Sequence, residues 1–129
     1  MDRSEKTEIN TKSDNFNAIS FFRKKVKQFV AERGWTKYHN PKNLIQALQI
    51  EAAELSELFL FKDKTIEEIK TENQLMEDIS DEVADIFIYL ISFINSLDID
   101  LTRAFQHKMQ KNRKKYNLRE FNDGKYYKK

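Results

Sequence analysis

The chain has 129 residues, of which 40% are hydrophobic and 34% charged, with two glycines, one proline and no cysteine. This length fits one domain, and so few helix breakers favour an all-α fold over a many-turned β fold. The lack of cysteine excludes disulfides and thiolate zinc sites and fits a reducing cytoplasm. The longest apolar run, residues 86–94, is too short to cross a bilayer, so we expect no membrane span and a cytoplasmic location.

Charge is unevenly distributed along the chain, although the net charge is only +2. Acidic residues gather between positions 51 and 85, and basic residues gather between positions 103 and 129. This asymmetry indicates an anionic ligand, while a basic tail is more often a solvated face than a nucleic-acid site. Nucleic-acid binding is therefore unexpected, and a helical nucleic-acid-binding module using the basic C-terminal region is the alternative hypothesis.

The first predicted helix follows a polar leader, residues 1–13. Ser13 or Asp14 can cap this helix, and Gly34 can end it in the left-handed conformation. Apolar residues recur between these signals at spacings of three and four, as in an amphipathic helix: Ile19, Phe22, Val26, Phe29 and Val30.

An aromatic link, residues 35–41, connects this helix to the next one. A plain connector would be small and polar, so Trp35 and Tyr38 either plug the end of a helical bundle or form a stacking wall for a nucleobase. His39 lies just before a helix start, where it can contact a phosphate or stay exposed.

The second predicted helix begins at Asn40-Pro41, with Asn40 as its N-cap, and runs to about Phe61. A turn of about 100° per residue places Glu51 in the middle of the apolar face and Glu54 at its edge. Glu57 falls outside that face, as a surface acid or a group near the site.

A connector over residues 62–71, with a short helical turn, leads to a third helix over residues 72–97. Glu82 is central to the apolar stripe of this helix, and Asp85 lies at the edge of the stripe. The following segment, residues 86–94, is apolar nearly all round, interrupted by Tyr89 and Ser92, which predicts burial on several sides and a helical dimer interface.

The fourth predicted helix covers residues 101–116, capped by Asp98 or Asp100, with Leu101, Ala104, Phe105 and Met109 facing inward. Lys108 and Asn112 lie one turn apart on it and can point at one ligand. The prediction is thus a bundle of about four main helices over residues 14–116, completed by oligomerisation and followed by a basic tail, residues 117–129.

Two acidic pairs, Glu51-x-x-Glu54 and Glu82-x-x-Asp85, interrupt these apolar faces. Residues three apart share a helix face, so two packed helices can present four carboxylates to one point. Such hard oxygen ligands suit Mg²⁺ or Mn²⁺, and magnesium commonly joins protein carboxylates to substrate phosphates. The blander alternative is that both pairs are surface acids. No P-loop is present, and no histidine follows these glutamates at the spacing of a di-iron site.

Four blocks carry a resemblance to a known family across residues 19–116: Trp35-x3-His39-x-Pro41-x-Asn43-Leu44, Glu51-Ala-Ala-Glu54-Leu-Ser-Glu57, Asp81-Glu82-Val-Ala-Asp85-Ile-Phe-Ile-Tyr89 and Lys108-Met-x-x-Asn112-Arg-x-x-Tyr116. In this order they closely resemble the MazG-like all-α nucleotide pyrophosphohydrolases, and within them the dCTP pyrophosphatase group. The resemblance implies a Mg²⁺-dependent enzyme that cleaves a nucleoside triphosphate, dCTP or a related pyrimidine deoxynucleotide, to the monophosphate and pyrophosphate.

The resemblance also implies roles for individual residues. Glu51, Glu54, Glu82 and Asp85 match metal ligands. In the mechanism that we expect, one of these four carboxylates or Glu57 accepts the proton of the attacking water, and the sequence does not choose among them. The positions that match nucleotide-pocket residues are Trp35, His39 and Tyr89, together with Lys108 and Asn112 on the last helix. Phe61 stands where dCTP-specific relatives carry a second tryptophan, and Val26 replaces a pocket histidine. Family members are dimers or tetramers, with sites where helices of two subunits meet.

Overall fold

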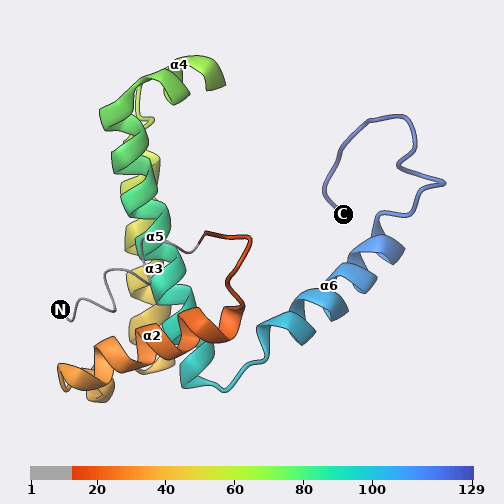
Figure 1. The fold of residues 1–129 in the computed structure, drawn as a ribbon. Coiled ribbons are helices and arrows are strands. Elements are labelled where there is room, and N and C mark those ends of the chain that lie inside the picture. Colours follow the sequence, from red (N-terminus) through yellow and green to blue (C-terminus); the bar gives the residue numbers. More distant parts are fainter. Residues whose placement is uncertain (1–12) are drawn as a thin grey trace. The chain divides into compact units, whose positions relative to one another are not determined.

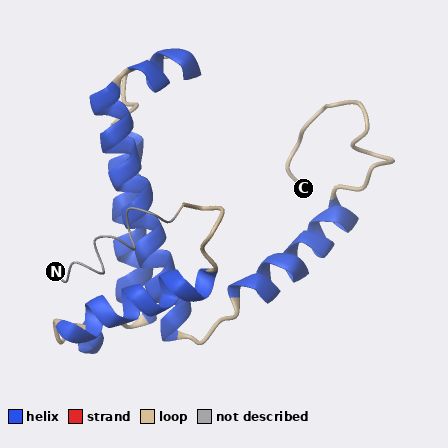
Figure 2. Ribbon diagram, in the orientation of Figure 1, coloured by secondary structure: helices blue, strands red, loops and turns tan. Residues whose placement is uncertain are grey.

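A computed structural model describes residues 13–129 of the chain, so all of the predicted leader except Ser13 lies outside the described residues. Within residues 13–129 the secondary structure is entirely helical (Figure 2), which confirms the all-α prediction. The elements are α2 (Ile19–Glu32), a 3₁₀-helix η1 (Thr36–Tyr38), α3 (Pro41–Glu57), α4 (Ile66–Thr71), α5 (Asn73–Ser96) and α6 (Leu101–Lys115).

The chain divides into two compact units, one ending at Leu97 and the other beginning at Asp98. In the first unit, α3 and α5 run side by side in opposite directions and α4 joins them at one end (Figure 1). Helix α2 lies across α5 and packs against it. Helix α5 therefore contacts α2, α3 and α4.

Helix α2 ends as predicted but begins differently. Gly34 has φ +66°, and the N–H groups of Gly34 and Trp35 donate to the carbonyls of Ala31 and Val30, each at 3.0 Å, which is a Schellman motif. The predicted N-terminal cap is wrong, because α2 starts after Ala18, which makes no side-chain cap.

The residues expected to cap α2 form a separate turn instead. The carbonyl of Ser13 accepts from the N–H of Phe16 at 3.0 Å and from Nδ2 of Asn17 at 2.8 Å. This turn uses the Ser13 main chain several residues before the helix, so neither Ser13 nor Asp14 is at the helix start.

Helix α3 starts with the predicted cap. Oδ1 of Asn40 accepts from the N–H of Asn43 at 2.9 Å, and Pro41 occupies the first helical position. The helix ends at Glu57, four residues earlier than predicted, and residues 58–61 form a turn. Phe61 has φ +57°, which a continuing right-handed helix does not allow.

The remaining helices follow their sequence signals. Thr65 and Glu68 form a capping box at the start of α4 within the predicted connector, and α5 matches the third predicted helix within one residue at each end. Asp100, rather than Asp98, caps α6 by accepting from the N–H of Arg103 at 3.0 Å.

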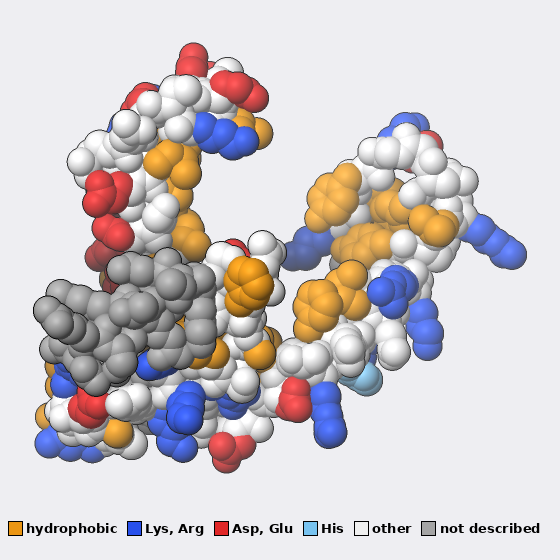
Figure 3. All heavy atoms as spheres, in the orientation of Figure 1, with side chains coloured by type: hydrophobic (Ala, Val, Ile, Leu, Met, Phe, Trp, Pro, Cys, Tyr) orange, Lys and Arg blue, Asp and Glu red, His pale blue; other side chains and the backbone are white. Residues whose placement is uncertain are grey.

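The apolar core of the first unit lies where α5 meets α2 and α3. Its buried members are Val30, Leu44, Leu75, Ile91 and Ile94, of which Ile91 is fully buried. Helix α6, in the second unit, has no buried residue, and Phe105, expected to face inward, is 63% exposed. No helix within residues 13–129 combines the length and apolar character needed to span a bilayer. On the face shown in Figure 3, acidic side chains lie along α4 and α5, and basic side chains lie on α2 and α6.

Candidate metal centre and nucleotide site

Three carboxylates from two helices converge in the first unit. Glu51 of α3 and Glu82 and Asp85 of α5 each offer one oxygen, and these three oxygens all lie within 4.8 Å of one another. One oxygen each of Glu51 and Glu82 is buried without a hydrogen-bond partner. A buried, unpartnered carboxylate oxygen is costly unless a cation neutralises it. Three hard oxygen donors at one point fit a divalent cation such as Mg²⁺.

The electrostatics of the cluster agree with this geometry. Burial, then the neighbouring carboxyl groups of Glu82, Glu54 and Asp85, raise the pKa of Glu51 to about 7 from 4.5. No cationic side chain is among the causes of this shift. Within residues 13–129, negative charge therefore gathers at this cluster, which favours a bound cation.

Glu54 and Glu57 lie beside the cluster. Glu54 is exposed and is close enough to Glu51 to contribute to the raised pKa, but it does not join the three converging oxygens. Glu57 is exposed at the last residue of α3. The helical phase thus separates the acids as predicted, with the buried oxygens on Glu51 and Glu82, and a role for Glu54 or Glu57 stays a prediction.

The aromatic link places Trp35 and His39 at opposite ends of η1. Trp35 is 45% exposed and packs edge-on against Phe29, with ring centroids 5.9 Å apart. Tyr38 is 58% exposed. These rings are therefore not buried plugs in this unit, and stacking on a base stays a prediction. His39 is half-buried, and burial lowers the pKa of its imidazole.

Tyr89 and Phe61 have very different surroundings. Tyr89 is half-buried on α5, four residues after Asp85 and hence one turn further along the same face. Phe61 follows α3 in the turn described above and is 99% exposed. A side chain so exposed packs against nothing in this unit, so any contact of Phe61 with a base stays a prediction.

Lys108 and Asn112 belong to the second unit. They lie four residues apart on α6, with Lys108 exposed and Asn112 half-buried. Their spacing agrees with the prediction that both side chains share one helix face. Their contact with a nucleotide stays a prediction.

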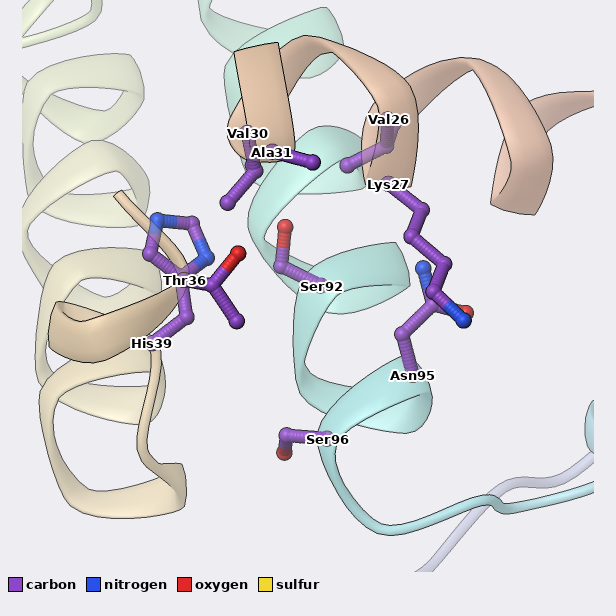
Figure 4. A pocket seen from close by; sticks show the side chains of 9 residues that line it. All are labelled: Val26, Lys27, Val30, Ala31, Thr36, His39, Ser92, Asn95 and Ser96. Carbon is purple, nitrogen blue, oxygen red and sulfur yellow. The ribbon is translucent and has the colours of Figure 1, made fainter. Parts of the chain in front are cut away.

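A cavity of about 160 Å³ lies between α2, η1 and α5 (Figure 4). Its walls are formed by Val26, Lys27, Val30, Ala31, Thr36, His39, Ser92, Asn95 and Ser96. Ser92 is 5% exposed, and its Oγ is buried without a hydrogen-bond partner. In the sequence, Ser92 stands out only as a serine within the apolar run 86–94. The packing of α2 on α5 places this serine in the wall of the cavity.

Comparisons with known proteins agree with this architecture. The MazG-like family profile matches residues 47–129. The chain is 37% identical over 90 residues to dCTP pyrophosphatase 1 of Rattus norvegicus, covering 69% of this chain and 53% of that protein. The dCTP pyrophosphatase 1 of Homo sapiens is 36% identical over 92 residues, with the same coverage. The chain thus spans about half the length of these curated relatives.

A solved structure also resembles this chain, over nearly the whole length of the solved chain. The crystal structure of a pyrophosphatase from Archaeoglobus fulgidus superposes with a TM-score of 0.71 at 32% sequence identity. The match covers 83% of this chain and 99% of the archaeal chain. The family profile includes all three converging carboxylates, since Glu51, Glu82 and Asp85 lie within residues 47–129. This chain belongs to the MazG-like family.

Proposed function

We propose that this protein is a Mg²⁺-dependent nucleoside triphosphate pyrophosphohydrolase that acts on dCTP or a related pyrimidine deoxynucleoside triphosphate. The convergence of Glu51, Glu82 and Asp85, with two buried oxygens that lack partners, is the observation that carries the proposal. Two curated relatives bear the name dCTP pyrophosphatase 1, and the archaeal relative is a pyrophosphatase. These names support the reaction class and the preference for a pyrimidine deoxynucleotide.

In the proposed reaction, water attacks the α phosphorus of the nucleotide. A bond forms between the water oxygen and the α phosphorus, and the bond from that phosphorus to the α–β bridging oxygen breaks. The products are the nucleoside monophosphate and pyrophosphate. A divalent cation bound at this site supplies charge screening for the triphosphate and polarises its phosphorus–oxygen bonds.

Side chains of this protein would bind the cation, accept the proton and contact the nucleotide. Glu51, Glu82 and Asp85 would hold the cation, because their oxygens already converge. Glu54 and Glu57, exposed beside them, are candidates to accept the proton of the attacking water. We propose that Lys108 neutralises the negative charge on the departing pyrophosphate and that Asn112, on the same helix, contacts the nucleotide.

We further propose that the protein acts as a homo-oligomer, a dimer or a tetramer. Apolar side chains remain exposed on both long helices of the first unit: Ile45 at 38%, Ile50 at 59%, Val83 at 49% and Ile88 at 41%. Apolar surface of this kind on long helices suits burial against a second copy. Light scattering coupled to size-exclusion chromatography measures the assembly, and a monomer at micromolar concentration would contradict this part of the proposal.

The reaction is tested by incubating the protein with each canonical dNTP and NTP and resolving the products. We expect pyrophosphate and monophosphate, fastest with a pyrimidine deoxynucleotide, only in the presence of Mg²⁺ or Mn²⁺. Glu82→Gln should remove this activity, since it deletes a charged oxygen donor at the cluster while nearly preserving side-chain volume. Release of single phosphate, or undiminished activity in Glu82→Gln, would exclude the proposed mechanism.

A further inference from the structure

The second unit, residues 98–129, carries the excess positive charge of the chain. It contains ten basic and four acidic residues, whereas residues 1–97 contain thirteen basic and seventeen acidic residues. Helix α6 itself has six lysines and arginines and no acidic residue. Like charges three or four residues apart on a helix repel one another, so an anionic partner would relieve this repulsion.

Most of the acidic side chains of this unit already have a basic partner within it. These ion pairs are Arg103–Asp100 at 3.6 Å, Lys125–Asp123 at 3.8 Å and Lys129–Glu120. Arg103 is the only basic residue of α6 that takes part in an ion pair within residues 13–129. The positive charge of the rest of α6 is therefore not neutralised by the unit itself.

The tail, residues 117–129, folds back onto the end of α6. The rings of Tyr116 and Phe121 pack edge-on with centroids 5.2 Å apart, and those of Phe121 and Tyr127 lie 4.8 Å apart. The N–H of Lys129 donates to Oη of Tyr116 at 3.2 Å, and Figure 1 shows the end of the chain returning toward α6. An aromatic cluster of Tyr116, Phe121 and Tyr127 thus holds the tail against the helix.

This packing brings lysines of the helix and of the tail to the same aromatic cluster. Nζ of Lys115 lies 5.5 Å from the centre of the Tyr116 ring, and Nζ of Lys129 lies 5.7 Å from the centre of the Phe121 ring. Lys111 is exposed one turn before Lys115 on the same face of α6. Figure 3 shows basic side chains around the hydrophobic side chains of this unit.

One aromatic ring of the tail remains outside the cluster. Tyr126 is 82% exposed and stands between Lys125 and Tyr127. An exposed ring near lysines suits single-stranded nucleic acid, because a base can stack on the ring while the lysines contact phosphates. The bases of a duplex are already stacked on one another, so a duplex offers phosphates to the lysines but no base face to Tyr126.

We propose that the second unit binds single-stranded nucleic acid through Lys111 and Lys115 of α6 and Tyr126 of the tail. The sequence alone makes such binding unexpected, because a basic segment is more often a solvated face. The folding of the tail onto α6 changes this expectation, since it gathers positive charge beside an exposed ring. The proposal is independent of the proposed reaction, because it uses neither the acidic cluster nor Lys108 and Asn112.

The test is fluorescence anisotropy of a labelled oligothymidylate, alone and in a duplex with its complementary strand, added to the full chain in chelator at low salt. We expect the single strand to bind more tightly than the duplex, with an affinity that falls as salt rises. Tyr126→Ala should weaken single-strand binding by about 5- to 100-fold, the effect of losing one stacked base, whereas Tyr126→Phe should retain it. Because Tyr126 is exposed, neither substitution should disturb the fold.

The contribution of the lysines is measured by the salt dependence. Replacing Lys111 and Lys115 together with glutamine should make the slope of log affinity against log salt shallower by about 1.4, at about 0.7 per phosphate contact. Lys24→Gln combined with Lys42→Gln is the matched control, since it removes two exposed lysines from the first unit and should leave the slope unchanged. An equal change of slope in both double variants would overturn the assignment to α6.

A last variant separates a folded surface from a merely charged tail. Phe121→Ala removes the ring that joins Tyr116 to Tyr127 and keeps every charge, and it should weaken binding by about fivefold or more. Circular dichroism checks that α6 stays helical. Undiminished binding by Phe121→Ala or Tyr126→Ala, no binding by wild type at low salt, or binding to phosphatidylserine vesicles in place of the oligonucleotide would overturn the proposal.

Discussion

Replacing Glu51 with glutamine should stabilise the metal-free protein at pH 8 and abolish its stabilisation by Mg²⁺. Burial, followed by the carboxyl groups of Glu82, Glu54 and Asp85, raises the pKa of Glu51 from 4.5 to about 7. The folded protein therefore binds this proton more tightly than the unfolded chain does. The contribution of this proton to the free energy of unfolding therefore falls as the pH rises from 4.5 to about 7, and it is lost completely above that range.

The size of the effect follows from the same shift. A pKa raised from 4.5 to about 7 corresponds to about 3 kcal/mol if all of it reached the free energy of unfolding. Glu51 is only partly buried, and solvent screening reduces the expected value to on the order of 1 kcal/mol. In a domain of this size that is about 4 °C in Tm. The glutamine amide can donate to the neighbouring carboxylates, so repulsion is replaced by hydrogen bonding.

Thermal unfolding of wild type and Glu51→Gln measures this in chelator at pH 5 and pH 8, and with Mg²⁺ at pH 8. Glu57→Gln is the matched control, since it removes an exposed carboxylate from the same helix. We expect Glu51→Gln to unfold at a higher temperature than wild type at pH 8 in chelator, with little difference at pH 5. Mg²⁺ should raise the Tm of wild type and of Glu57→Gln only. An equal or lower Tm for Glu51→Gln at pH 8 in chelator would refute the reasoning.

Three further substitutions test how the site is positioned, each by its effect on Tm. Asn40→Ala removes the cap that accepts from the N–H of Asn43 and should cost about 1 kcal/mol, while unchanged stability would show that the cap does not hold α3. Gly34→Ala should lower the free energy of unfolding by about 1 kcal/mol, because Gly34 has φ +66°, which residues with a Cβ rarely adopt. The added Cβ meets no atom within 4 Å, so this backbone conformation is the source of the cost. Arg23→Ala should cost about 1 to 2 kcal/mol by leaving Oδ1 of Asn95 without its donor, and a neutral result would show that this pair does not tie α2 to α5.

Local signals in the sequence predicted those element boundaries that depend on one residue. Asn40, Gly34 and Asp100 each end or begin a helix through a bond that the residue itself supplies or permits. The end of α3 had no such signal, since neither glycine nor proline follows Glu57 and the positive φ falls on Phe61. A cap was wrongly placed at Ser13, because a turn competes for its main chain.

In the candidate site too, features set by one helix could be predicted from the sequence, whereas features set by packing between helices could not. The helical phase predicted that Glu51 and Glu82 bury an oxygen, because that property follows from each helix and the face it packs. The cavity beside Ser92 could not be predicted from one helix, because it exists only where α2 crosses α5 beside η1. The side chains of Lys108 and Asn112 belong to a separate unit, so their share in the site rests on the sequence pattern.

The measurement that tests the central claim most directly is titration of the nucleotide-free protein with Mn²⁺, with bound metal followed by electron paramagnetic resonance. The claim is that Glu51, Glu82 and Asp85 together form a divalent-cation site. We expect wild type and Glu57→Gln to bind the metal with equal affinity, and Glu82→Gln to lose more than about tenfold in affinity. Equal binding by Glu82→Gln and wild type, or no binding by wild type, would contradict the claim.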